Sequence, residues 1–165
     1  MADTPAAAPA QDAGAQNLVQ FAIDRIYVKD LSLENPGAPQ SFQTSESPAV
    51  EIGLRTRTDQ LDTDVYECVL TVTITARSGE KTLFLVEAAQ AGIFTIRGVP
   101  QNQLQPVIAI HCPTVLFPYV RETIADATAR AGYPPVHIAP INFEALYQQQ
   151  LAQMQPQGAP AVAAN

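Results

Sequence analysis

The first half of the chain alternates apolar and polar residues, a pattern typical of β-strands. Over residues 65–76 every even-numbered residue is apolar, whereas threonine and glutamate occupy most odd-numbered positions. This alternation places the apolar residues on one face of a strand. A second β-rich run, from Lys81 to Phe94, follows after a Ser-Gly turn. We therefore predict an antiparallel hairpin.

A shorter strand is predicted before this hairpin. Val50, Ile52 and Leu54 alternate with neighbours that are polar or small. The polar residues 59–64 are expected to form the turn that separates this strand from the hairpin.

The longest predicted strand covers residues 18–34. Its apolar residues change parity after Ile23, since the next ones are Ile26 and Val28. A bulge near Arg25 would keep them all on one face. The proline-rich residues that follow predict an irregular crossover rather than a tight turn.

The second half of the chain changes to the period of helices. Val120, Ile124 and Ala127 recur at intervals of three or four residues, and Pro118 is expected to be the first residue of this helix. Gly132 and the two prolines after Tyr133 are expected to end it.

Two more helices are predicted on either side of this one. A short helix is expected over residues 103–111. Pro113, two residues later, is expected to interrupt the helical backbone. Near the C-terminus, Asn142 is expected to cap a helix with four large side chains on neighbouring turns: Phe143, Leu146, Tyr147 and Gln150.

This order of elements predicts one folded unit. Strands followed by helices favour an α+β fold, with a four-stranded antiparallel sheet and helices packed on one face. The folded domain is expected over residues 18–151. Residues 1–17 and 152–165 are rich in Ala, Pro, Gln and Gly, and are predicted to be disordered tails.

Composition narrows the function classes. Only 15% of residues are charged, so self-association is one way to cover the uncharged surface. A net charge of −7 argues against binding to nucleic acid or to an anionic membrane, and suits a basic protein partner. Two cysteines form no disulfide framework, and the first residues lack the regions of a signal peptide. A cytosolic protein without membrane insertion is expected.

No arrangement of residues predicts catalysis or a metal site. His111 and Cys112 are adjacent and should point apart, so buried residues at a helix end are the preferred interpretation. The aspartates of residues 59–64 lack the glycine and the final acid of a calcium loop. His137 has no second ligand at metal spacing.

Several blocks of the sequence resemble the SecB family of export chaperones. They are Phe21–Pro36, the segment 64–87, Gly92–Ile96, Cys112–Glu122 and Ile138–Leu146. The strongest block is Cys112–Glu122, which reads CPTVLFPYVRE. The resemblance covers nearly the whole predicted domain.

The resemblance implies a passive holding function. The family assembles as a homotetramer, a dimer of dimers, which binds unfolded precursors without ATP and delivers them to the motor SecA. Four positions match family contacts for SecA: Asp30, Glu34, Leu85 and Glu87. The matching segment of SecA is basic and carries its own zinc, so no cofactor is expected here.

Two further sets of residues follow from the resemblance and from apolar character. Val86, Ala88 and Gln90 match positions that influence tetramer assembly, and by alternation they face away from Leu85 and Glu87. The hypothetical client groove consists of Phe42, Ile93, Phe94, Leu116, Phe117 and Tyr133. Glu46 stands where the family often has tryptophan.

Other functions stay open at this point. One is a monomeric or dimeric binding module with an apolar cleft for a small molecule. Another is a small hydrolase or isomerase, for which Asp24 or Glu67 would need a strongly raised pKa. A SecB-like holder devoted to another client, such as a toxin–antitoxin partner, is the third.

Overall fold

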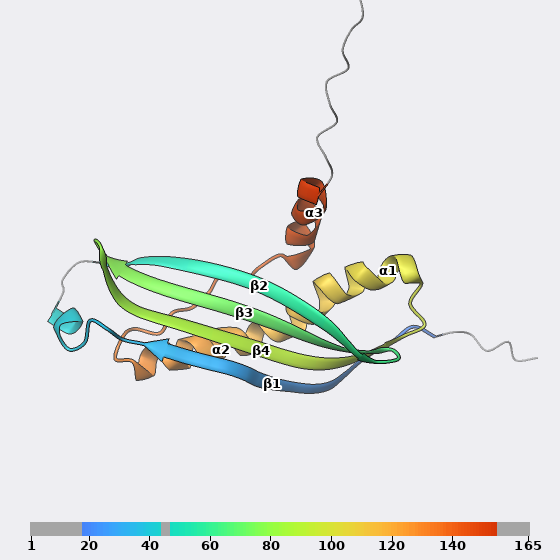
Figure 1. Cartoon of the computed structure of the whole chain (residues 1–165), viewed down its shortest axis with the longest axis horizontal. Helices are drawn as coiled ribbons and strands as arrows, with labels where there is room; N and C mark the ends of the chain where they lie inside the picture. The colour runs from blue at the N-terminus through green and yellow to red at the C-terminus, as the bar shows by residue number, and fades with distance from the viewer. Residues whose placement is uncertain (1–17, 44–46, 155–165) are drawn as a thin grey trace, which may run out of the picture.

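The structure is a computed structural model that describes residues 18–43 and 47–154. A single layer of strands is covered on one face by α2 (Figure 1). In chain order the elements are β1 (Gln20–Glu34), the 3-10 turn η1 (Gln40–Gln43), β2 (Ala49–Asp62), β3 (Val65–Ser78), β4 (Lys81–Arg97), α1 (Gln101–Pro106), the π-helical segment η2 (Val107–His111), α2 (Cys112–Arg130) and α3 (Phe143–Met154).

The four strands form one antiparallel sheet in the order β1-β4-β3-β2. Tight turns join β2 to β3 and β3 to β4, with positive φ angles of 60° at Asp64 and 57° at Gly79. The crossover after β1 carries the chain across the sheet, so that β1 pairs with β4 rather than with β2. The predicted α+β fold and the hairpin are therefore confirmed.

β1 contains two bulges. Its register against β4 shifts between Ile23 and Arg25, and again between Val28 and Asp30. Each extra residue returns the next apolar side chain to the same face. The bulge predicted near Arg25 is confirmed, and the second explains why the later leucines regain the first parity. Six apolar residues thus share one face: Phe21, Ile23, Ile26, Val28, Leu31 and Leu33.

β2 is longer than predicted. It continues to Asp62, so the expectation of a turn over residues 59–64 was wrong for its first part. Thr56, Thr58 and Gln60 continue the alternation and pair with β3. A polar strand forms here because β3 supplies its hydrogen-bond partners, which the hydropathy of β2 alone does not reveal.

The predicted start of the main helix at Pro118 was wrong. Helical backbone runs through α1, η2 and α2, with Pro118 inside α2 and Pro113 in its first turn. An internal proline removes one backbone hydrogen bond at a cost of about 3 kcal/mol. Burial of the side chains around Pro118, including Leu116 and Val120, outweighs that local preference.

The helix ends follow the predicted capping rules. Gly132 has a φ of 89°, and the Tyr133 amide donates to the carbonyl of Thr128, which is a Schellman ending. The Asn142 side chain accepts a hydrogen bond from the Ala145 amide at 2.9 Å and caps α3, as predicted. α3 continues to Met154, beyond the domain boundary expected at residue 151. Residues 1–17 and 155–165 lie outside the described residues.

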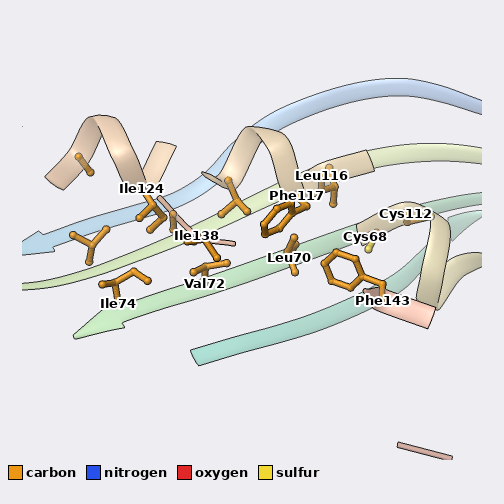
Figure 2. Close-up of a cluster of buried hydrophobic side chains, with 14 of the residues drawn as sticks. Cys68, Leu70, Val72, Ile74, Cys112, Leu116, Phe117, Ile124, Ile138 and Phe143 are labelled. Carbon is orange, nitrogen blue, oxygen red and sulfur yellow. The ribbon is translucent and has the colours of Figure 1, made fainter. Parts of the chain in front are cut away.

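The core lies between α2 and the even-numbered residues of β3 and β4. We call this side of the sheet the helix face and the opposite side the outer face. Figure 2 shows Leu70 and Val72 of β3 directed toward Leu116 and Ile124 of α2, and all four are fully buried. Beneath Leu116, a side chain at Gly92 would approach the Phe94 ring to 2.8 Å, so it would displace these buried core side chains.

Leu116→Ala should lower the free energy of unfolding by about 2–5 kcal/mol, because it leaves a cavity in this core. The matched control is Leu61→Ala, since Leu61 is 52% exposed. Its effect should be within about 0.5 kcal/mol. Urea unfolding at one fixed protein concentration measures both. Equal effects of the two substitutions would contradict the assigned core.

Candidate functional site

The four residues predicted to contact SecA share the outer face. Glu34 pairs with Leu85, and Asp30 lies four residues before Glu34 on β1, opposite Ala89. Glu87 lies between these two pairs on β4 and accepts a hydrogen bond from the Thr73 hydroxyl at 2.8 Å. We call Asp30, Glu34 and Glu87 the acidic patch. Leu85 is half-buried beside it.

The three residues predicted to influence tetramer assembly face the other way. Val86, Ala88 and Gln90 are 0%, 1% and 3% exposed on the helix face. The split by alternation between these residues and the pair Leu85 and Glu87 is therefore present in the structure. All three are therefore already buried within one protomer, where they lie opposite Leu33, Leu31 and Val28 of β1.

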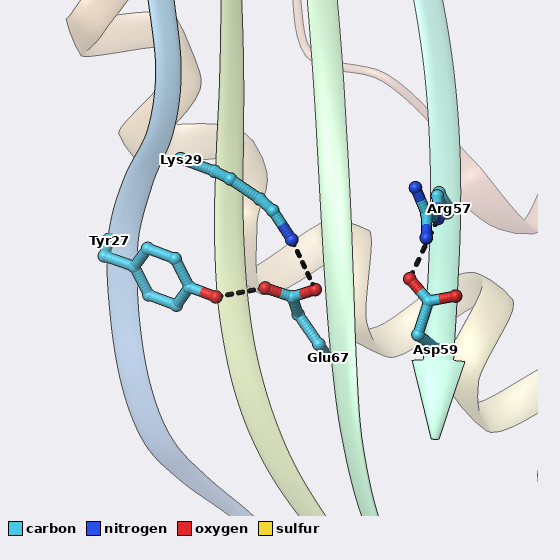
Figure 3. Close-up of polar contacts among 5 residues, drawn as sticks. All are labelled: Tyr27, Lys29, Arg57, Asp59 and Glu67. Atoms are coloured by element: carbon cyan, nitrogen blue, oxygen red, sulfur yellow. Dashed lines mark hydrogen bonds and ion pairs between the residues drawn. The ribbon is translucent and has the colours of Figure 1, made fainter. Parts of the chain in front are cut away.

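A polar triad lies next to the acidic patch on the outer face. Tyr27 and Lys29 extend from β1 across β4 to Glu67 on β3 (Figure 3). The Lys29 Nζ atom is 2.6 Å from Oε2 of Glu67, and the Tyr27 hydroxyl donates to Oε1. Ala91, the partner of Tyr27 on β4, is small enough for these side chains to cross.

The triad shifts the pKa values of two of its members. The hydrogen bonds from Lys29 and then Tyr27 lower the pKa of Glu67. The hydrogen bond to Glu67 raises the pKa of Tyr27 to about 12. The Glu67 contribution to stability is present above its ordinary pKa and is lost as pH falls through the lowered value. The Tyr27 contribution is complete below its ordinary pKa and is lost as pH rises through about 12.

These shifts are opposite to what the enzyme hypothesis requires. A general acid needs a raised carboxyl pKa, whereas that of Glu67 is lowered by its ion pair. Asp24 is exposed and accepts a hydrogen bond from the Thr95 hydroxyl at 2.6 Å. Neither Asp24 nor Glu67 lies in a closed apolar pocket in the part of the chain that the structure describes, so neither has the environment that the hydrolase or isomerase hypothesis requires.

The other candidate ligands also have ordinary structural roles. Asp59 forms an ion pair with Arg57 at 2.8 Å, and the Asp62 carboxylate accepts a hydrogen bond from the Thr63 amide. Within residues 18–43 and 47–154, no three His, Cys, Asp or Glu side chains are grouped to hold a metal ion. Cys112 is buried, as predicted, whereas the expectation that His111 is buried was wrong. The helical backbone continues through His111, whose exposed side chain lies edge-on to Phe21 of the edge strand β1, with ring centroids 6.3 Å apart.

A large groove lies between β2, α1 and α3. Its volume is about 970 Å³, near the upper end of the usual range for ligand sites. Threonine and glutamine side chains form most of its polar lining. The apolar lining residues come from every element around it: Leu54, Tyr66, Leu104, Ile108, Phe143, Leu146 and Tyr147.

The six residues proposed from sequence for a client groove do not lie together. Phe94 and Leu116 are fully buried and Phe117 is 8% exposed, so these three belong to the core rather than to a surface. Ile93 lies on the outer face, opposite Arg25.

Outside this core, Phe42 and Tyr133 come together, with ring centroids 5.2 Å apart where the crossover meets the end of α2. Glu46 lies outside the described residues. The groove below α3 was missed because its walls come from segments far apart in sequence. The apolar series Phe143, Leu146 and Tyr147 on α3 was the available signal.

Comparison with known proteins supports one family. The family model described as "Preprotein translocase subunit SecB" matches residues 14–154. The chain is 50% identical over 150 residues to a protein-export protein SecB of Burkholderia cenocepacia, covering 91% of this chain and 92% of that protein. It is 51% identical to the corresponding protein of Burkholderia lata over 91% of this chain and 94% of that one.

A solved structure has a similar fold. It is a SecB-like chaperone of Mycobacterium tuberculosis in complex with a peptide from the HigA1 antitoxin. The TM-score is 0.61 at 16% identity, covering 73% of this chain and 90% of that chain. In the part of the chain that the structure describes, no helix has the length and apolarity needed to cross a membrane.

The triad predicts an unusual tyrosine titration. The tyrosinate absorbance that is lost in Tyr27→Phe should appear near pH 12 in the unchanged protein, because ionisation would break the hydrogen bond to Glu67 and also place two negative charges together. Glu67→Gln should move it toward the ordinary value near 10. A Tyr27 signal near 10 in the unchanged protein would contradict the hydrogen bond to Glu67.

Proposed function

The chain belongs to the SecB family of protein-export chaperones, and we propose that it holds unfolded precursors in the cytosol without ATP and delivers them to SecA. The observation that carries this proposal is the match to SecB relatives over 91% of the chain at about 50% identity. The groove supports the holding step, and the acidic patch supports the delivery step.

The groove between β2, α1 and α3 is the proposed client site. Its base is apolar, with Tyr66, Ile108 and Phe143 at most 8% exposed. Burial of client side chains there is worth roughly 25 cal/mol per Å² and depends little on sequence. The threonines and glutamines around it can hydrogen-bond the backbone of any extended segment. Weak selectivity of this kind suits a chaperone with many clients.

Assembly would multiply this site. We infer a homotetramer, a dimer of dimers, with one groove in each protomer. A long unfolded chain that occupies one groove reaches the next by an intramolecular step, which raises the overall affinity by roughly 10²–10⁴. Folded proteins would bind poorly because their apolar segments are buried.

The acidic patch is the proposed docking site for SecA. Three carboxylates from two adjacent strands offer a negative surface to a basic segment, and Leu85 adds an apolar contact beside them. Charge complementarity increases the association rate and orients the partner. The patch favours an exporter over a holder devoted to another client, because such a holder has no need of a SecA contact.

Client capture should depend on the groove. Leu104→Ser combined with Leu146→Ser should weaken binding of an unfolded, slow-folding precursor by about tenfold or more, because two apolar contacts are lost. Leu31→Ser combined with Leu33→Ser is the control, since these leucines lie on β1 and outside the groove. Light scattering should find about four protomers with one precursor. A monomer that binds only a compact small molecule would favour the small-ligand cleft instead.

SecA binding should depend on the patch. Reversal of both Asp30 and Glu34 to lysine should weaken SecA binding by at least tenfold and leave precursor binding unchanged. Reversal of Glu51, which is on the outer face but on the opposite edge strand, is the control. Titration calorimetry with purified SecA measures both variants. Unchanged affinity after the double reversal would place the SecA contact elsewhere.

A further inference from the structure

Lys29 is a cation placed beside the acidic patch. It occupies the second bulge of β1 and immediately precedes Asp30. An ammonium group so close to Asp30 would neutralise part of the negative surface if it paired with that carboxylate. In the structure, Lys29 pairs instead with Glu67, two strands away. Among the described residues, neither Asp30 nor Glu34 forms an ion pair.

Glu67 is held in place to receive this charge. Its side chain is 10% exposed, compared with 45% for Lys29, so the carboxylate is the more enclosed partner of the pair. The Tyr27 hydroxyl occupies Oε1 and leaves Oε2 for the Lys29 ammonium. The pair therefore forms across β4 rather than along β1.

A second ion pair, between Arg57 and Asp59, lies beside Glu67 on the outer face. Asp59 lies directly opposite Glu67 on β2, and two like charges in that position repel each other. Arg57 binds Asp59 at 2.8 Å and offsets its charge (Figure 3). Glu67 and Asp59 therefore each pair with a separate cation, Lys29 and Arg57 respectively.

We propose that Glu67 is a positioning residue of the SecA-docking surface, which binds the Lys29 ammonium and so leaves Asp30 unneutralised for the basic segment of SecA. This inference rests on the proposed docking function of the acidic patch. Glu67 does not itself contact SecA in this scheme. The effect of Glu67 on SecA binding depends only on the position of the Lys29 ammonium group.

The test compares three variants of the full-length protein with purified SecA. Glu67→Gln releases Lys29 toward Asp30 and should slow association about two- to fivefold at low ionic strength, with a smaller effect at high salt. The double variant Lys29→Met with Glu67→Gln restores the original net charge and leaves Asp30 unpaired, so it should recover the original rate. Lys29→Met alone should associate at least as fast as the unchanged protein. Stopped-flow fluorescence measures the rates, and light scattering checks that assembly is unaltered.

Each outcome separates the proposal from a purely structural role. A structural Glu67 would leave the double variant as slow as Glu67→Gln, and that result would overturn the proposal. If Glu67→Gln does not fold, Lys29→Met still decides, because slower association of that variant would also overturn it. The double reversal of Asp30 and Glu34 is measured in parallel. If the reversal abolishes binding while Glu67→Gln has no effect, the docking function stands and the role of Glu67 fails; if the reversal has no effect, the docking function itself fails.

Discussion

Packing of α2 against the even-numbered residues of β3 and β4 is the interaction on which the other features of the protomer depend. It buries Leu70, Val72 and Val86 completely, and it assigns the two faces of the sheet to different tasks. With one face covered, the odd-numbered residues of β3 from Glu67 to Thr75 and of β4 from Leu85 to Thr95 are directed to the outer face. The acidic patch and the triad can therefore form there without competing with the core. The same packing holds Pro118 within a helix that local preference would interrupt.

The strands and their faces were predictable because alternation records burial directly. The changes in parity along β1 were also informative, because each one corresponds to a bulge in the structure. The helix boundaries were less predictable, since Pro113 and Pro118 look like interruptions until the burial of their neighbours is known. The extension of β2 was hidden for a related reason, because Thr56 and Thr58 take their pairing from β3.

The candidate sites were likewise predictable from the sequence only in part. Asp30, Glu34 and Glu87 could be placed on one surface from alternation and family resemblance, because strand geometry fixes which residues are neighbours. The groove could not, because its walls come from β2, α1 and α3 and meet only in three dimensions. Apolar character alone also failed to separate exposed Phe42 from buried Phe94. Both are large and aromatic, and only their position relative to α2 distinguishes them.

The π-helical segment η2 has a consequence for how the groove and the core are related. A π turn closes over five residues rather than four, and so holds more residues than an α turn. In a regular helix one residue corresponds to a rotation of about 100°. η2 therefore lets α1 present Leu104 to the groove while α2 presents Leu116 to the sheet, although both belong to one continuous run of helical backbone. Loss of one residue between Pro106 and Pro113 would turn one of these surfaces away from its neighbours. The length of this short segment is thus under a constraint that its own side chains do not reveal.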